Sequence, residues 1–147
     1  MASSAPEKDN TLEVKSAIAK KYDSVVEKNV LTWISGVLKN PDLFNGVSGA
    51  DALQEKLKSG VILCNLMNAI KPGCIKKFNS NAKMPFQQME NIGLFNEAMR
   101  NYGVQSDYLF VTTDLFEGKN MVQVLIGLRA LGSKASSVGI KPAIVEN

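Results

Sequence analysis

Two long segments of this chain would be apolar on nearly every face if they formed helices. They are Leu57–Ile70 (LKSGVILCNLMNAI) and Asn120–Leu131 (NMVQVLIGLRAL), and Gly132 is expected to end the second. A helix that is apolar all round must be covered by other helices. Two such helices within 147 residues predict an all-α fold, one compact domain of four main helices plus short connecting helices around a buried central helix pair. A fold of this kind favours a binding module.

Three amphipathic segments are expected to cover this pair. A short helix is predicted over residues 10–22. A second helix begins at a capping box, Ser24–Glu27, and ends before Asn40-Pro41. A third runs over Pro85–Tyr102, with proline in its first turn and glycine directly after it.

The remaining segments are predicted to be irregular. Residues 1–9 are expected to be disordered, residues 41–56 to form a loop with at most one short helical turn, and residues 74–84 to form an exposed basic connection. Residues 110–113 have a strand-like composition, but no second strand is available to pair with them. Residues 135–147 read as a polar tail.

The expected core takes its side chains from the helical stripes. Trp33 is the only tryptophan and lies on the apolar stripe of its helix, as do Phe86 and Met89 on theirs. Gly60 falls inside the first apolar segment, where a closely approaching neighbour helix would explain a glycine. The residues predicted for the core are Trp33, Leu63, Leu66, Ile92, Phe95, Leu125 and Leu128.

Catalysis and metal binding find little support in the composition. The chain has no histidine, which removes Ser-His and Cys-His catalysis and most catalytic zinc sites. Cys64 and Cys74 are predicted to be free thiols in a reducing cytosol. Asp114 and Asn120 are expected to cap helices rather than to act on a substrate, and no base accompanies Asp114 and Glu117. We therefore expect no enzyme activity, no cofactor and no metal.

The mildly basic charge suits an acidic partner. The formal net charge is +3 and the pI is near 8.8. A filament, an anionic lipid surface and a nucleic acid would all fit this balance, which does not choose among them. Met1–Asn10 lacks the features of a secretion signal, and no apolar run is long enough to cross a bilayer, so a cytoplasmic location is expected.

Several separated motifs, in order, resemble the calponin homology domain of the transgelin and calponin family, including its invertebrate muscle members. The motifs are EVKSAIAKKYD from Glu13, VLTWI around Trp33, LKSGVILCNL from Leu57, MENIGLF from Met89 and DLFEGKN from Asp114. The resemblance covers about residues 12–134. It implies a domain over residues 10–134, and residues 137–145 resemble the segment that leads towards a calponin-type repeat, which is absent here.

The resemblance also implies a function. It predicts a monomeric, cytoplasmic cytoskeletal module that associates with F-actin or actin-linked partners and has no enzyme activity. Without the repeat, the chain is expected to be an excised domain or a truncated relative, and direct filament binding is expected to be weak. No nucleic-acid partner and no transmembrane segment are expected.

Lysines and arginine supply the candidate contact residues. Carried over by position from the family, Lys20, Lys21 and Lys28 are the first choice for contact with actin, and Lys119 and Arg129 are the second. The same residues are explained equally well by an ordinary solvent-exposed face that contacts no partner. A separate group of lysines would suit phosphoinositide headgroups, namely Lys71, Lys76, Lys77 and Lys83.

Other functions stay open at this point. The main alternative is a regulatory scaffold that binds signalling kinases or other actin-binding proteins and contacts actin little. An enzyme would need a deep pocket lined with convergent polar groups. Microtubule binding is used by another branch of the same fold, but the transgelin-like motifs match this chain better.

Overall fold

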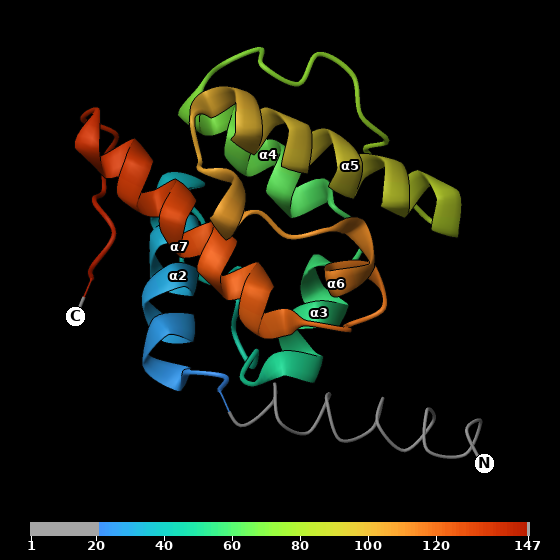
Figure 1. Ribbon diagram of the computed structural model, residues 1–147, viewed down its shortest axis with the longest axis horizontal. Coiled ribbons are helices and arrows are strands. Elements are labelled where there is room, and N and C mark those ends of the chain that lie inside the picture. Colours follow the sequence, from blue (N-terminus) through green and yellow to red (C-terminus); the bar gives the residue numbers. More distant parts are fainter. Residues whose placement is uncertain (1–20, 147) are drawn as a thin grey trace, which may run out of the picture.

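The computed structural model describes residues 21–146, which form an all-α domain (Figure 1). The elements in chain order are α2 (Ser24–Val37), α3 (Ala50–Leu57), α4 (Val61–Ile70), α5 (Pro85–Tyr102), the 3₁₀ turn η1 (Ser106–Tyr108), α6 (Thr112–Phe116) and α7 (Met121–Ser137). The described part of the chain holds no strand, so the all-α prediction is confirmed. The predicted lead-in over residues 1–9 and most of the predicted helix over residues 10–22 lie outside the described residues.

The helices pack in two main pairs. Helix α4 packs mostly on α5, and α7 packs mostly on α2, with α6 lying against both α5 and α7. Helix α3 contacts α4, α6 and α7 from below in Figure 1. Each of the two apolar helices, α4 and α7, thus has its own principal partner. Within residues 21–146, no helix combines the length and the hydrophobicity that a bilayer crossing requires.

The first apolar segment is two helices rather than one, which corrects the prediction for Leu57–Ile70. Leu57 ends α3, and α4 begins at Val61. Gly60 between them has φ of 77°, a left-handed conformation that glycine adopts without a steric penalty. A Cβ on Gly60 would lie 2.5 Å from Cβ of Asn91 on α5, so the expected close approach exists, but at a turn.

Helix α3 was also missed, because residues 41–56 were predicted to be mostly loop. Only the segment up to Gly49 is irregular, and the eight residues that follow are helical. Leu53 and Leu57 are its two fully buried side chains. Two large apolar side chains over eight residues are too few to reveal a helical period beside Gly46 and Gly49.

Helix ends with local signals were predicted well. Helix α5 begins at Pro85 and is closed by Gly103, which has φ of 110°. Asn120 caps α7 by accepting a hydrogen bond at Oδ1 from Gln123 N, at 3.1 Å. The cap of α2 was assigned wrongly to Ser24: the carboxylate of Asp23 accepts from the backbone N–H groups of Val25 and Val26.

The core includes all seven side chains proposed for it. Each of Trp33, Leu63, Leu66, Ile92, Phe95, Leu125 and Leu128 is at most 3 % exposed. Phe86 and Met89, also expected inside, are 64 % and 37 % exposed. They lie in the first turns of α5, which extend beyond α4 in Figure 1.

The C-terminal segment packs on the domain instead of forming a polar tail. Helix α7 continues through Gly132 to Ser137, and residues 138–146 then return towards α2 (Figure 1). Gly132 leaves room for Ile144, whose Cδ1 would lie 2.7 Å from an added Cβ. Ser136 Oγ accepts from Ile144 N at 2.9 Å. Because Gly132 has no side chain, Ile144 can pack against it. The glycine does not end the helix.

This contact makes Ile144 part of the core. Replacing Ile144, which is 7 % exposed, with alanine is expected to lower the free energy of unfolding by about 2–3 kcal/mol. The neighbouring Val145→Ala, at a position 52 % exposed, should change it by about 0.5 kcal/mol or less. Urea denaturation followed by the fluorescence of Trp33 measures both variants, and equal values would show that the segment contributes no core packing.

Candidate protein-docking site

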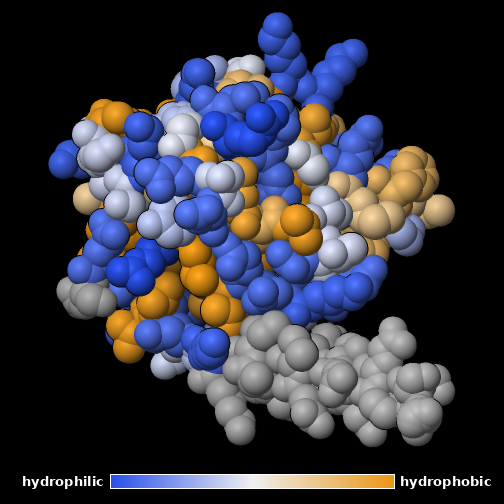
Figure 2. Space-filling view, in the orientation of Figure 1, coloured by the Kyte–Doolittle hydropathy of each residue, from blue (hydrophilic) through white to orange (hydrophobic). Residues whose placement is uncertain are grey.

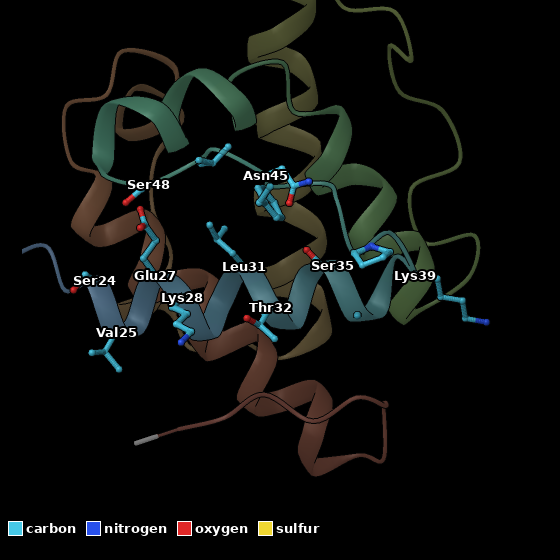
Figure 3. Close-up of a pocket in the computed structure, with 14 residues that line it drawn as sticks. Ser24, Val25, Glu27, Lys28, Leu31, Thr32, Ser35, Lys39, Asn45 and Ser48 are labelled. Atoms are coloured by element: carbon cyan, nitrogen blue, oxygen red, sulfur yellow. The ribbon is translucent and has the colours of Figure 1, made fainter.

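A groove runs between α2 and the segment that follows it. Residues of α2 form one wall and residues 39–48 form the other, enclosing about 870 Å³ (Figure 3). Leu31 and Phe44 are its buried apolar residues, and Val47 beside them is half-buried. In Figure 3, Glu27 and Leu31 point from α2 towards the segment that carries Asn45 and Ser48. We call this hollow the α2 groove.

An exposed basic stripe borders the α2 groove. Lys28 and Thr32 lie four residues apart on one face of α2, Ser35 follows within the next turn, and Lys39 comes just after the end of the helix. Lys28, Thr32 and Lys39 are exposed. Lys39 follows the helix in the left-handed conformation, with φ of 55°, and directs the chain towards Pro41. The stripe thus has a lysine at each end and hydroxyl groups between them.

Near the start of α2, the lining of the groove includes a buried carboxylate, that of Glu27. Glu27 is only 5 % exposed, and its side chain accepts hydrogen bonds from Tyr22 Oη and, at 2.9 Å, from Gly49 N. Burial, together with the hydrogen bond to Glu27, raises the pKa of Tyr22 well above its ordinary value, so this hydroxyl stays a donor at neutral pH. Glu27 therefore joins the start of α2 to the start of α3, instead of completing the capping box expected with Ser24.

The structure does not gather the predicted contact residues into one patch. Lys28 borders the α2 groove, and Lys21 is exposed just before α2. Lys20 lies outside the described residues. Lys119 is exposed and pairs with Glu117, at 3.5 Å between Nζ and Oε1. Arg129 on α7 lines a different hollow of about 560 Å³ together with Lys134.

Sequence reasoning missed Lys39 as a companion of Lys28. The spacing from Lys28 through Thr32 and Ser35 to Lys39 was available as a signal. Lys39 falls within the predicted helix, directly before Asn40-Pro41, but the contact residues were carried over by position from the family and did not include it. The role of Glu27 had no local signal, since its partners Tyr22 and Gly49 meet it only in the folded chain.

The described residues carry no obvious catalytic or metal-binding group. Residues 21–146 contain no group of three or more His, Cys, Asp or Glu side chains placed to hold a metal ion. Asp114 Oδ2 accepts from Val111 N at 3.0 Å, which confirms a capping role. Cys64 is fully buried, and its thiol donates to Asn91 O.

The two thiols are expected to be poor nucleophiles. Burial raises the pKa of Cys64 to about 12 and also raises that of Cys74. At pH 8, iodoacetamide should leave Cys64 unmodified and modify Cys74 only slowly, while both should react after unfolding. Because the fold retains the Cys64 proton, its contribution to stability holds below about pH 8.5 and declines as the pH rises towards 12. Peptide mass mapping measures the modification, and rapid native labelling of Cys64 would contradict its burial.

Comparison with known proteins gives a consistent result. The family model of the Calponin homology (CH) domain matches residues 24–137. Myophilin of Echinococcus granulosus is 44 % identical over 134 residues, which cover 90 % of this chain and 67 % of myophilin. Calponin-2 of Mus musculus is 39 % identical over 132 residues, which cover 90 % of this chain and 41 % of calponin-2. The chain therefore spans about two thirds of myophilin and about two fifths of calponin-2.

A solved structure has the same fold. The calponin-homology domain of Rng2 from Schizosaccharomyces pombe superposes with a TM-score of 0.68, and the alignment covers 93 % of this chain and 79 % of that domain. Its sequence identity is 24 %, so this likeness concerns the fold alone.

Proposed function

The chain belongs to the calponin homology (CH) domain family, and on this premise we propose that it is an actin-associated cytoskeletal module that docks on F-actin through the basic stripe of α2. The expectation of no enzyme activity agrees with membership in this family of structural domains. In this proposal a rigid helical core holds Lys28 and Lys39 against an acidic surface of the filament. No substrate is turned over.

The observation that carries the proposal is the placement of the stripe. Lys28 and Thr32 share one exposed face of α2, exposed Lys39 lies just beyond the helix, and all three line the rim of an apolar groove. Lysines on such a rim mainly increase the association rate and the specificity for an acidic partner, while apolar contacts slow dissociation. Lys21 is exposed just before α2 and is proposed as a further contact. Lys119 and Arg129 are secondary contacts, because the structure places them elsewhere.

The affinity of this chain alone is proposed to be weak. A few exposed charges attract an acidic surface only modestly, and their field is screened within about 8 Å at physiological salt. Binding should therefore be clearest at low ionic strength.

Charge reversal on the stripe is expected to weaken binding about tenfold. In Lys28→Glu/Lys39→Glu, two attractive contacts become repulsive, a change of more than about 1.4 kcal/mol. The matched control is Lys56→Glu/Lys141→Glu, which has the same net charge and changes two exposed lysines that do not line the groove. Co-sedimentation with F-actin at low ionic strength measures both. Equal losses in the two double variants would mean that net charge, and not the stripe, governs binding.

A second candidate function uses the groove itself. An apolar hollow of about 870 Å³ between α2 and residues 39–48 could accept a short segment of another protein. The chain would then act as a regulatory scaffold for signalling kinases or other actin-binding proteins. A pull-down that recovers such proteins but no actin, and that Leu31→Asp abolishes in the folded variant, would favour the scaffold over direct filament docking.

A further inference from the structure

The start of α5 forms an exposed apolar projection. Met84, Phe86 and Met89 are 53 %, 64 % and 37 % exposed, and Phe86 and Met89 lie three residues apart on one helical face. Figure 2 shows a pale orange projection at the edge of the molecule where α5 begins in Figure 1. We call this group the α5 projection. Clustered exposed apolar side chains of this size mark an interaction surface more often than a solitary exposed residue does.

Several lysines precede the projection in a stretch of sequence that contains no acidic residue. No acidic residue occurs between Glu55 and Glu90. Within residues 71–89, four lysines are present and all four are exposed: Lys71, Lys76, Lys77 and Lys83. This segment therefore carries +4, more than the +3 of the whole chain. The local charge is strongly positive although the protein as a whole is only mildly basic.

Hydrogen bonds hold this basic segment against α5. Asn79 N donates to Asn91 Oδ1 at 2.8 Å, and Asn79 Nδ2 donates to Glu90 Oε1 at 2.7 Å. Closer to the projection, Gln88 Nε2 donates to Ala82 O at 2.9 Å. Asn91 is fully buried, so the anchor is internal to the domain. Asn79 and Ala82 are thus tied to α5, which holds the basic segment in place before any partner arrives and lowers the entropy cost of binding.

We propose that the α5 projection binds the surface of an anionic lipid bilayer. The side chains of Phe86 and Met84 enter the headgroup region, and Lys76, Lys77 and Lys83 face the anionic headgroups. Apolar insertion and a polybasic patch are the two signals that together give stable attachment of a peripheral protein. A projecting apolar tip suits a deformable lipid surface, whereas a protein partner would need a matching socket.

The proposed membrane surface is separate from the α2 groove. Helix α5 packs on α4 and α6, whereas α2 packs on α7 and α4. Figure 1 shows the start of α5 on the opposite side of the domain from α2. The inference does not depend on actin binding, and both surfaces can be occupied at once.

Flotation of the full chain with lipid vesicles tests the proposal. Vesicles of phosphatidylcholine and phosphatidylserine are expected to carry the protein, and pure phosphatidylcholine vesicles are not. Lys76→Glu/Lys77→Glu should weaken flotation about tenfold or more, and Phe86→Ser several-fold. The matched controls are Lys56→Glu/Lys141→Glu for charge and Val111→Ser for an apolar residue that is 62 % exposed elsewhere. Circular dichroism checks that each variant is folded.

A fluorescent reporter tests insertion directly. Trp33 is 1 % exposed and should not respond to vesicles, so the emission of a Phe86→Trp variant reports on the projection. A blue shift with phosphatidylserine vesicles, absent in a Val111→Trp variant, supports the proposal. Three results would overturn it: no flotation of the unmodified chain, equal losses in test and control variants, or flotation without a blue shift. If the unmodified chain does not float, the α5 projection would instead be assigned to a protein partner.

Discussion

Gly60→Ala is expected to lower the free energy of unfolding by about 2–5 kcal/mol. Two separate penalties add at this position. The left-handed backbone, with φ of 77°, disfavours any residue that has a Cβ. The new methyl group would also lie 2.5 Å from Asn91 Cβ and 3.1 Å from Ile92 N, so α5 would have to move away from α4.

The matched control is Gly93→Ala, on the same helix that Gly60 approaches. A Cβ at Gly93 meets nothing within 4 Å, and its backbone is helical. Alanine there should leave stability unchanged or raise it by up to about 1 kcal/mol. Urea denaturation, followed by the fluorescence of Trp33, compares both variants with the unmodified chain. A loss below about 1 kcal/mol for Gly60→Ala would contradict the tight turn between α3 and α4.

Trp33→Ala is expected to cost about 3–5 kcal/mol. The side chain is 1 % exposed, and α2 packs against both α4 and α7. Its removal leaves a large cavity beside both apolar helices. Since many domains of this size are stable by only about 5–15 kcal/mol, the variant should melt at a markedly lower temperature.

Trp33→Phe separates packing from hydrogen bonding. Nε1 of Trp33 is buried and has no hydrogen-bond partner among the described residues. Phenylalanine fills much of the same volume without an unpaired donor, so its cost should be well below that of alanine. Thermal unfolding followed by circular dichroism measures both, because the variants lack the native fluorophore. Equal melting temperatures for all three proteins would place Trp33 outside the core.

The sequence predicts those parts of the fold that local chemistry determines. Pro85 and Gly103 define both ends of α5, because proline suits a first helical turn and glycine suits a left-handed cap. Asn120 likewise marks the start of α7 through its own side chain. The absence of a pairing strand for residues 110–113 was also sufficient to keep the prediction all-α.

Features that depend on tertiary contacts were not predictable. The break at Gly60 follows Lys58-Ser59, a polar interruption that the single-helix prediction passed over, while its steric reason, the approach of Asn91 from α5, exists only in the folded chain. Gly132 was interpreted as a helix end, whereas its role is to admit Ile144 from a returning segment. Phe86 and Met89 follow the helical period of α5, but their part of the helix extends past the core.

The candidate site likewise has one part that the sequence predicts and another that depends on tertiary contacts. Lys28 was chosen by position from the family resemblance, and the structure places it exposed beside the groove. The groove beside Lys28 could not be predicted from the sequence, since residues 39–48 form its second wall only in the folded chain. The separation of Lys28 from Lys119 and Arg129 also depends on how α2, α6 and α7 are arranged.

Photocrosslinking from α2 to F-actin tests the central claim most directly. Thr32 is exposed between Lys28 and Lys39, so a benzophenone amino acid placed there should form a covalent adduct with actin at low ionic strength. The same probe at exposed Val111 should not. A chain that pellets with the filament but gives no adduct from Thr32, or gives as much from Val111, would contradict docking through the basic stripe of α2.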